Sequence, residues 1–225
     1  MFFSIYSRIF AQQMTTQMKR IALISLILLL CCSIGYTVGN KLIYFTADIP
    51  YGKGTITMRF HLNPLKSACA IGDEAYYKTC VPVDTEGELI IPDSIAYDGV
   101  NYPIRWLSRG AFQSCPNLTR IKLPSNLLSI SDLAFQGCTS LRELTFPDSI
   151  KTIYPQAFIG CTALRRVRFC NYWPPRCYND DTFDETTYST ATLVVPVEAA
   201  EYYLSHPLTH RFRYHAEIIP IYNNE

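Results

Sequence analysis

The hydrophobic positions of this chain recur at a fixed interval between residues 110 and 169. The pairs Ala111-Phe112, Ala134-Phe135 and Ala157-Phe158 are separated by steps of 23 residues. The three copies share four core positions, which are filled by Phe112, Cys115, Leu118 and Ile121, then by Phe135, Cys138, Leu141 and Leu144, then by Phe158, Cys161, Leu164 and Val167. A period in the twenties with apolar residues at fixed positions is typical of a solenoid, in which each repeat buries its face on the next.

Each copy contains one short segment in which apolar and polar residues alternate. In the first copy Ile121 and Leu123 alternate with polar residues, and Pro124 follows. Alternation with period two predicts a strand with one buried face, and a proline that cannot donate to the ladder predicts its end. The Ala-Phe half of each copy then returns the chain on the opposite side, as a turn or a short helical segment.

This pattern resembles the 23-residue, Treponema-type leucine-rich repeat of BspA-like surface proteins of Bacteroidetes, over Leu107–Phe169. The resemblance implies an α/β-type repeat solenoid, short and curved, with a parallel strand ladder. Residues 88–95 and 192–196 resemble weaker copies of the strand half, and Asp98-Gly99 is a hairpin turn signal. We therefore expect a β-rich N-terminal cap with a degenerate repeat over 36–102, the leucine-rich repeats over 103–176, and a mixed C-terminal cap over 177–225 that has a helix over 198–205 and a strand over 212–222.

The N-terminal segment has the parts of a secretory signal peptide, which we assign to residues 1–35. Met18-Lys19-Arg20 precedes an apolar run over 21–30, which is short of the about 20 residues that span a bilayer. Translation starting at Met18 and cleavage near Gly35 fit this pattern. Lipid attachment at Cys31 or Cys32 is the alternative. Signal-peptide cleavage and lipid attachment both predict a secreted or cell-surface protein. Such a protein would contact a membrane only through the lipid anchor.

Composition and cysteine usage narrow the class of protein. The 225 residues are 48% hydrophobic with a net charge of +1, which excludes a disordered chain and a strongly basic nucleic-acid binder. Nine cysteines in an exported chain suggest disulfides. The three cysteines of the repeat are better explained as small buried hydrophobic residues. The disulfide candidates are therefore Cys69 with Cys80 and Cys170 with Cys177.

Residue patterns that would indicate catalysis or metal binding are absent from the sequence. His206 and His210 have the spacing of two metal ligands on a helix, but Pro207 replaces the glutamate of a zinc peptidase and interrupts the helix. The acidic cluster over 180–185 does not alternate as a calcium loop does. We therefore predict a protein that is not an enzyme and has no cofactor or metal.

The strand residues between the buried positions should line the concave face of the solenoid. Six of nine are basic and only Glu143 is acidic; the basic ones are Arg120, Lys122, Arg142, Arg165, Arg166 and Arg168. Arginine binds carboxylates, sulfates and phosphates through paired hydrogen bonds. This face predicts docking to a protein or an anionic glycan, and the family resemblance implies adhesion to a host or neighbouring cell. Nucleic acid is not expected, since no aromatic residues are interleaved. A structural or envelope-assembly component without an external ligand is the alternative.

Overall fold

The computed structural model of the chain describes residues 42–73, 79–179 and 181–219, with residues 214–219 described by their backbone alone. The predicted signal peptide, its start at Met18 and the lipid-anchor candidates Cys31 and Cys32 lie outside these residues. Within them, no helix is long and apolar enough to cross a membrane.

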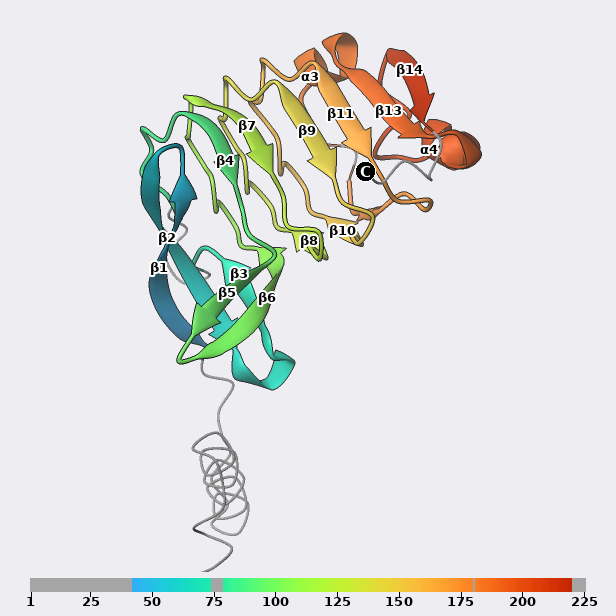
Figure 1. Ribbon diagram of the computed structural model, residues 1–225. Coiled ribbons are helices and arrows are strands. Elements are labelled where there is room, and N and C mark those ends of the chain that lie inside the picture. Colours follow the sequence, from blue (N-terminus) through green and yellow to red (C-terminus); the bar gives the residue numbers. More distant parts are fainter. Residues whose placement is uncertain (1–41, 74–78, 180, 220–225) are drawn as a thin grey trace, which may run out of the picture. The chain divides into compact units, whose positions relative to one another are not determined.

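One sheet is a parallel ladder of six strands in the order β14-β13-β11-β9-β7-β4 (Figure 1). Its members are β4 (Gly87–Ile90), β7 (Leu118–Lys122), β9 (Glu143–Phe146), β11 (Arg166–Phe169), β13 (Thr192–Pro196) and β14 (Tyr214–Ile219). All adjacent pairs are parallel. The predicted repeat solenoid is therefore confirmed, and the two weaker copies of the strand half contribute β4 and β13 to the same ladder.

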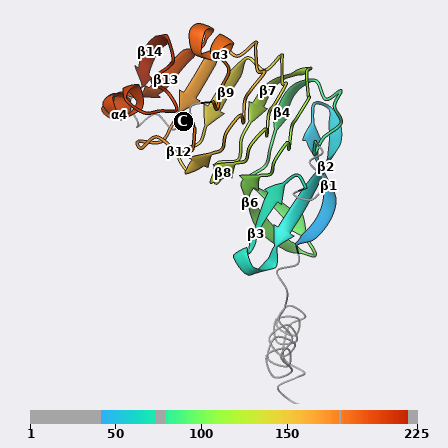
Figure 2. The same cartoon turned by 180° about the vertical axis from the view of Figure 1, so that it is seen from behind.

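The second sheet joins the N-terminal strands to the short return strands of the repeats (Figure 2). It consists of β1 (Ile43–Tyr51), β2 (Gly54–Asn63), β3 (Ala68–Ile71), β6 (Val100–Leu107), β8 (Ser129–Ile130), β10 (Thr152–Ile153) and β12 (Arg176–Cys177), with β5 (Ser94–Tyr97) beside β6. The first three strands pair antiparallel, whereas β3 to β12 pair parallel. Asp98 and Gly99 form the predicted hairpin turn between β5 and β6, both with positive φ (47° and 75°).

The Ala-Phe half of each repeat is a turn that passes twice through the left-handed region of the backbone. The residue before the alanine has φ of 62° at Gly110, 57° at Leu133 and 57° at Gln156. The residue before the cysteine has φ of 58°, 73° and 79°, at Ser114, Gly137 and Gly160 respectively. Between these positions the phenylalanine N–H donates to the alanine carbonyl of the next repeat, at 2.7 Å for Phe112 to Ala134 and 2.8 Å for Phe135 to Ala157. The turn therefore aligns each repeat on its neighbour.

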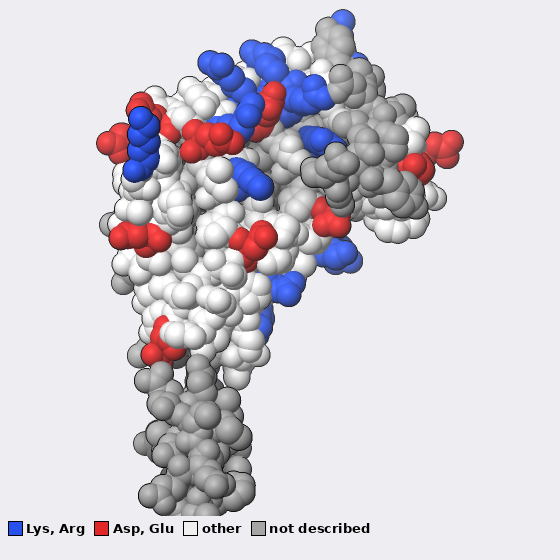
Figure 3. All heavy atoms as spheres, in the orientation of Figure 1, with Lys and Arg blue, Asp and Glu red and all other residues white. Residues whose placement is uncertain are grey.

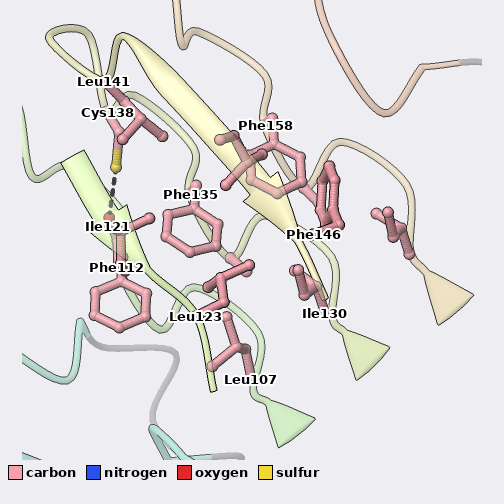
Figure 4. Close-up of a cluster of buried hydrophobic side chains, with 14 of the residues drawn as sticks. Leu107, Phe112, Ile121, Leu123, Ile130, Phe135, Cys138, Leu141, Phe146 and Phe158 are labelled. Carbon is pink, nitrogen blue, oxygen red and sulfur yellow. Dashed lines mark hydrogen bonds between the residues drawn. The ribbon is translucent and has the colours of Figure 1, made fainter. Parts of the chain in front are cut away.

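Stacked aromatic rings fill the core along the repeat axis (Figure 4). The ring centroids of Phe112 and Phe135 are 5.0 Å apart, as are those of Phe135 and Phe158, with interplanar angles of 12° and 9°. Phe183 continues this column beyond the repeats that the sequence predicts, and its ring centroid lies 5.2 Å from that of Phe158. All twelve repeat-core residues are buried. Since such pairs contribute about 0.5–1.5 kcal/mol beyond their buried area, the column favours a constant repeat spacing.

The repeat cysteines lie beside this column, and two of them, Cys138 and Cys161, bond to the backbone of the preceding repeat. The thiol of Cys138 donates to the carbonyl of Phe112 at 3.1 Å (Figure 4). That of Cys161 donates to the carbonyl of Phe135 at 3.3 Å. Burial raises the pKa of Cys115 to about 11. All three thiols therefore pack as buried groups, and those of Cys138 and Cys161 each also satisfy a carbonyl.

The predicted disulfides are wrong. Cys69 is a free thiol on β3 that donates to the carbonyl of His61 at 3.2 Å, and Cys80 is a free thiol beside Cys115. Cys170 is also a free thiol and is therefore not joined to Cys177. The two cysteines of each predicted pair are close in the sequence, which suggested that a disulfide closes a short loop. In the structure the Cys69 thiol on β3 points toward the backbone of β2, whereas Cys80 packs in the repeat core.

The C-terminal part contains the predicted short helix and strand. These are α4 (Ala200–Leu204), which follows the 3-10 turn η2 (Val197–Ala199), and β14. Another helix, α3 (Glu185–Thr190), precedes β13 and begins after Asp184. The Asp184 carboxylate accepts hydrogen bonds from Thr187 N at 2.8 Å and Gly160 N at 3.0 Å. Part of the acidic cluster therefore caps a helix and joins it to the last clear repeat.

We predict that Gly160→Ala destabilises the protein more than Gly137→Ala. Both residues have positive φ, which costs a residue with a side chain about 1–2 kcal/mol. A Cβ at Gly160 would also lie 3.3 Å from the Gly137 backbone, whereas one at Gly137 has no neighbour closer than 3.8 Å. Urea unfolding of the two variants measures the difference, and equal losses of unfolding free energy would contradict the close approach of the two turns.

We also predict that Cys69 and Cys80 resist alkylation in the native protein and become labelled on unfolding without reductant. Burial raises the pKa of Cys69 to about 12 and that of Cys80 well above its usual range, so little reactive thiolate is present. Mass spectrometry of the labelled peptides measures this. A disulfide would instead leave both peptides unlabelled until reductant is added.

Candidate interaction surface

The exposed face of the ladder presents its side chains in two rows across the strands. The first row contains Glu88, Arg120, Glu143, Arg166 and Thr192, each opposite the next in the strand register. The second row, two residues further along each strand, contains Ile90, Lys122, Thr145, Arg168 and Val194. Val194 is buried, so the accessible part of the face extends from β4 to β11.

Acidic and basic residues alternate along the first row, so the face that was predicted to be basic carries charges of both signs. Glu88 on β4 lies opposite Arg120, and Arg120 forms an ion pair with Glu143 at 3.1 Å. Both side chains of this pair are at least half exposed, so the pair contributes little to stability. Arg166 lies on the other side of Glu143. The sequence missed Glu88 because β4 precedes the clear repeats.

The six predicted basic residues do not all belong to this face. Four of them, Arg120, Lys122, Arg166 and Arg168, lie in the two rows. Arg142 and Arg165 each precede a strand by one residue. The Arg165 guanidinium donates to the carbonyls of Thr162 and Leu164, both at 2.9 Å, and therefore holds the turn before β11.

Charge is distributed unevenly along the face. Its end at β11 carries Arg166 and Arg168, Lys122 lies nearby on β7, and Arg142 immediately precedes β9. Its β4 end carries Glu88 and the exposed Ile90. Figure 3 shows basic and acidic side chains interspersed along the upper part of the molecule. We call Lys122, Arg166 and Arg168 the basic end of the face.

A groove of about 980 Å³ opens at the β4 end of the ladder, beside the turn between β1 and β2. The charged residues that line it are Glu86 and Glu88, and its apolar walls include Ile90 and Pro92. The Tyr51 hydroxyl accepts a hydrogen bond from Glu86 N at 2.9 Å, which joins the β1–β2 turn to the ladder. The two ends of the face therefore suit ligands of opposite charge.

An exposed aromatic cluster, which the sequence analysis did not identify, lies outside the ladder face. Trp173 is 62% exposed and packs against Tyr202 of α4, with ring centroids 4.5 Å apart. Tyr172 contacts both rings, at 5.1 and 5.6 Å. The signal in the sequence was the Trp173-Pro174-Pro175 break in the repeat register, where the chain leaves the coil and exposes its rings.

His206 and His210 have structural contacts. Nδ1 of His206 accepts a hydrogen bond from Leu208 N at 3.2 Å, and Nδ1 of His210 lies 3.1 Å from the carbonyl of Pro207. Among the residues that the structure describes, no group of three or more His, Cys, Asp or Glu side chains could hold a metal ion. The histidine pair therefore lies in the C-terminal turn, where each ring has a backbone contact.

Comparison with known families agrees with this geometry. The family model described as "BspA type Leucine rich repeat region (6 copies)" matches residues 100–199. This chain carries a BspA-type leucine-rich repeat region. Leucine-rich repeat regions of this kind typically serve as binding modules, and their stacked strands offer an extended surface to a partner.

Comparisons with individual proteins are less informative than the family match. A crystal structure of the T. pallidum leucine-rich repeat protein TpLRR is similar to 62% of this chain and to 69% of that protein, with 21% identity and a TM-score of 0.48. No curated protein matches the chain.

We predict that acidification destabilises the C-terminal turn through His206. Burial, and secondarily the charge of His210, lowers the pKa of His206 below its usual 6.5. The unfolded chain then binds a proton at higher pH than the native protein does, so stability falls as pH drops below about 6.5. His206→Gln should reduce this loss, and His210→Gln should keep most of it. Urea unfolding between about pH 5 and 8 measures both variants, and an unchanged pH profile in His206→Gln would contradict the assignment.

Proposed function

We propose that this chain is an exported interaction module that binds an acidic protein surface or an anionic glycan through the basic end of its ladder face. The observation that carries the proposal is the register of the ladder, which places Arg166 and Arg168 of β11 in the two exposed rows, with Lys122 of β7 in the same row as Arg168. Fields of one sign accelerate the association of an oppositely charged partner. Arginine adds directional hydrogen bonds to carboxylates and sulfates.

Adhesion to a host or neighbouring cell is the biological form of this activity that the family resemblance supports. The basic run and apolar segment before residue 31 support export of the chain. The mature protein is then secreted or held at the cell surface, by a lipid at Cys31 or Cys32 if one of these is modified. A partner outside the cell would meet the ladder face without crossing a membrane.

A structural role within the envelope of the producing cell is the second candidate. It is supported by β4, an edge strand of the ladder with the exposed Ile90 and the acidic groove beside it. Unpaired strand edges are sites at which other chains add. In this role the acidic end of the face, rather than the basic end, would carry the contacts.

We predict that Arg166→Glu with Arg168→Glu weakens binding to immobilised heparin and to an acidic polypeptide by about tenfold or more, with a smaller dependence on salt. Lys53→Glu with Lys151→Glu is the matched control, because it changes net charge equally at exposed positions outside the ladder. Surface plasmon resonance at several salt concentrations measures both pairs. Equal losses in the two pairs would reduce the effect to net charge and contradict the proposed site.

Affinity capture distinguishes the two candidates. The mature chain and its Arg166→Glu, Arg168→Glu variant are compared as baits on host extracellular matrix and on envelope of the producing cell. The first candidate predicts matrix proteins or glycans that the variant no longer retains. Envelope proteins retained equally by both baits support the second candidate instead.

A further inference from the structure

A separate hollow of about 340 Å³ lies on the second sheet, where the N-terminal strands meet the repeats. The register aligns His61 of β2, Ala70 of β3, Trp106 of β6 and Ser129 of β8 in one row across the sheet. Ala70 and the neighbouring Ala68 are small, so the sheet is recessed between larger side chains on either side. The hollow therefore forms where β3 pairs with β6.

The lining of this hollow is rich in groups that both donate and accept hydrogen bonds. Ser108, Ser129, Ser131 and Tyr154 contribute hydroxyls, and Asn63 contributes an amide. Ser108 is 3% exposed and its hydroxyl has no hydrogen-bond partner among the described residues. An unpaired buried hydroxyl is unfavourable, so a polar ligand that reaches it after a rotation about Cα–Cβ relieves that cost.

One cation and one large ring complete the lining. The Lys66 ammonium lies 5.0 Å from the centroid of the Trp106 ring, over its face. None of the twelve lining residues carries a carboxylate. The site therefore favours a ligand with a negative charge, many hydroxyls and an apolar face that can lie against an indole.

We propose that this hollow binds a single carboxylated sugar ring. Its volume is at the small end of ligand sites, which suits one ring rather than an extended chain. An amino acid fits less well, because no lining residue carries a carboxylate that could pair with its ammonium group. A phosphate also fits less well, because it would meet a single cation here. The site lies on the other sheet from the ladder face, so it does not depend on the function proposed above.

The two tryptophans of the chain allow a direct test. Trp173→Phe leaves Trp106 as the only tryptophan, so fluorescence in this background reports on the hollow alone. The protein is titrated with the methyl glycosides of glucuronic acid, of N-acetylneuraminic acid and of glucose. We expect a saturable change with at least one acidic sugar, and about tenfold or weaker binding of the neutral sugar. No change with either acidic sugar, or equal affinity for the acidic and neutral sugars, overturns the proposal.

Two variants assign the signal to the hollow. Lys66→Met should weaken binding of the acidic sugar by about tenfold and leave the neutral sugar nearly unchanged, whereas Lys53→Met at an exposed turn should change neither. Ser129→Leu should abolish binding of both sugars because the larger side chain fills the hollow. If Ser129→Leu does not fold, Lys66→Met, which changes an exposed side chain, decides the outcome. Unchanged affinity in Lys66→Met overturns the proposal.

The source of the sugar and the independence of the site are tested in the same assay. An oligosaccharide that carries the acidic sugar at its non-reducing end is compared with the monosaccharide. Binding of both indicates a glycan terminus, and binding of the monosaccharide alone indicates a free sugar. The Arg166→Glu, Arg168→Glu variant should keep its sugar affinity, and loss of that affinity would contradict a separate site.

Discussion

The turn around each Ala-Phe pair is the constraint on which the rest of this structure depends. Its two left-handed positions direct the phenylalanine N–H at the next repeat, and the rings then stack at 5.0 Å. Left-handed backbone is costly at Leu133 and Gln156, and it is retained because hydrogen bonds and ring contacts on both sides compensate for it. The spacing of the repeats, and with it the spacing of every exposed side chain, follows from this turn.

A constant spacing also turns small sequence differences into a pattern of charge. Because equivalent residues lie opposite each other, Glu88, Arg120, Glu143 and Arg166 form one alternating row rather than scattered charges. The alternation reduces the positive field in the middle of the face and leaves Arg166 and Arg168 at one end to dominate it. The same chain thus presents an acidic end and a basic end on a single sheet, while the sugar-sized hollow lies on the other.

Much of the fold could be predicted from the chain because the repeat supplies its own alignment. The buried positions, the strands at Ile121, Leu144 and Val167, and the hairpin at Asp98-Gly99 all follow from local pattern. Phe183 was missed because its step of 25 residues breaks the period. The prediction of the disulfides was wrong because the spacing of cysteines along a chain does not determine the direction in which each thiol points. The hollow beside Trp106 depends on the pairing of β3 with β6, a long-range contact that no local pattern encodes.

The thiol-to-carbonyl bonds of Cys138 and Cys161 bear on how such a protein can evolve. A disulfide between two units needs a cysteine in each, so gene duplication of one unit would leave an unmatched thiol. Here each unit brings a thiol for which the unit before it already supplies the acceptor. The array can therefore lengthen or shorten by one unit at a time without leaving a reactive cysteine exposed.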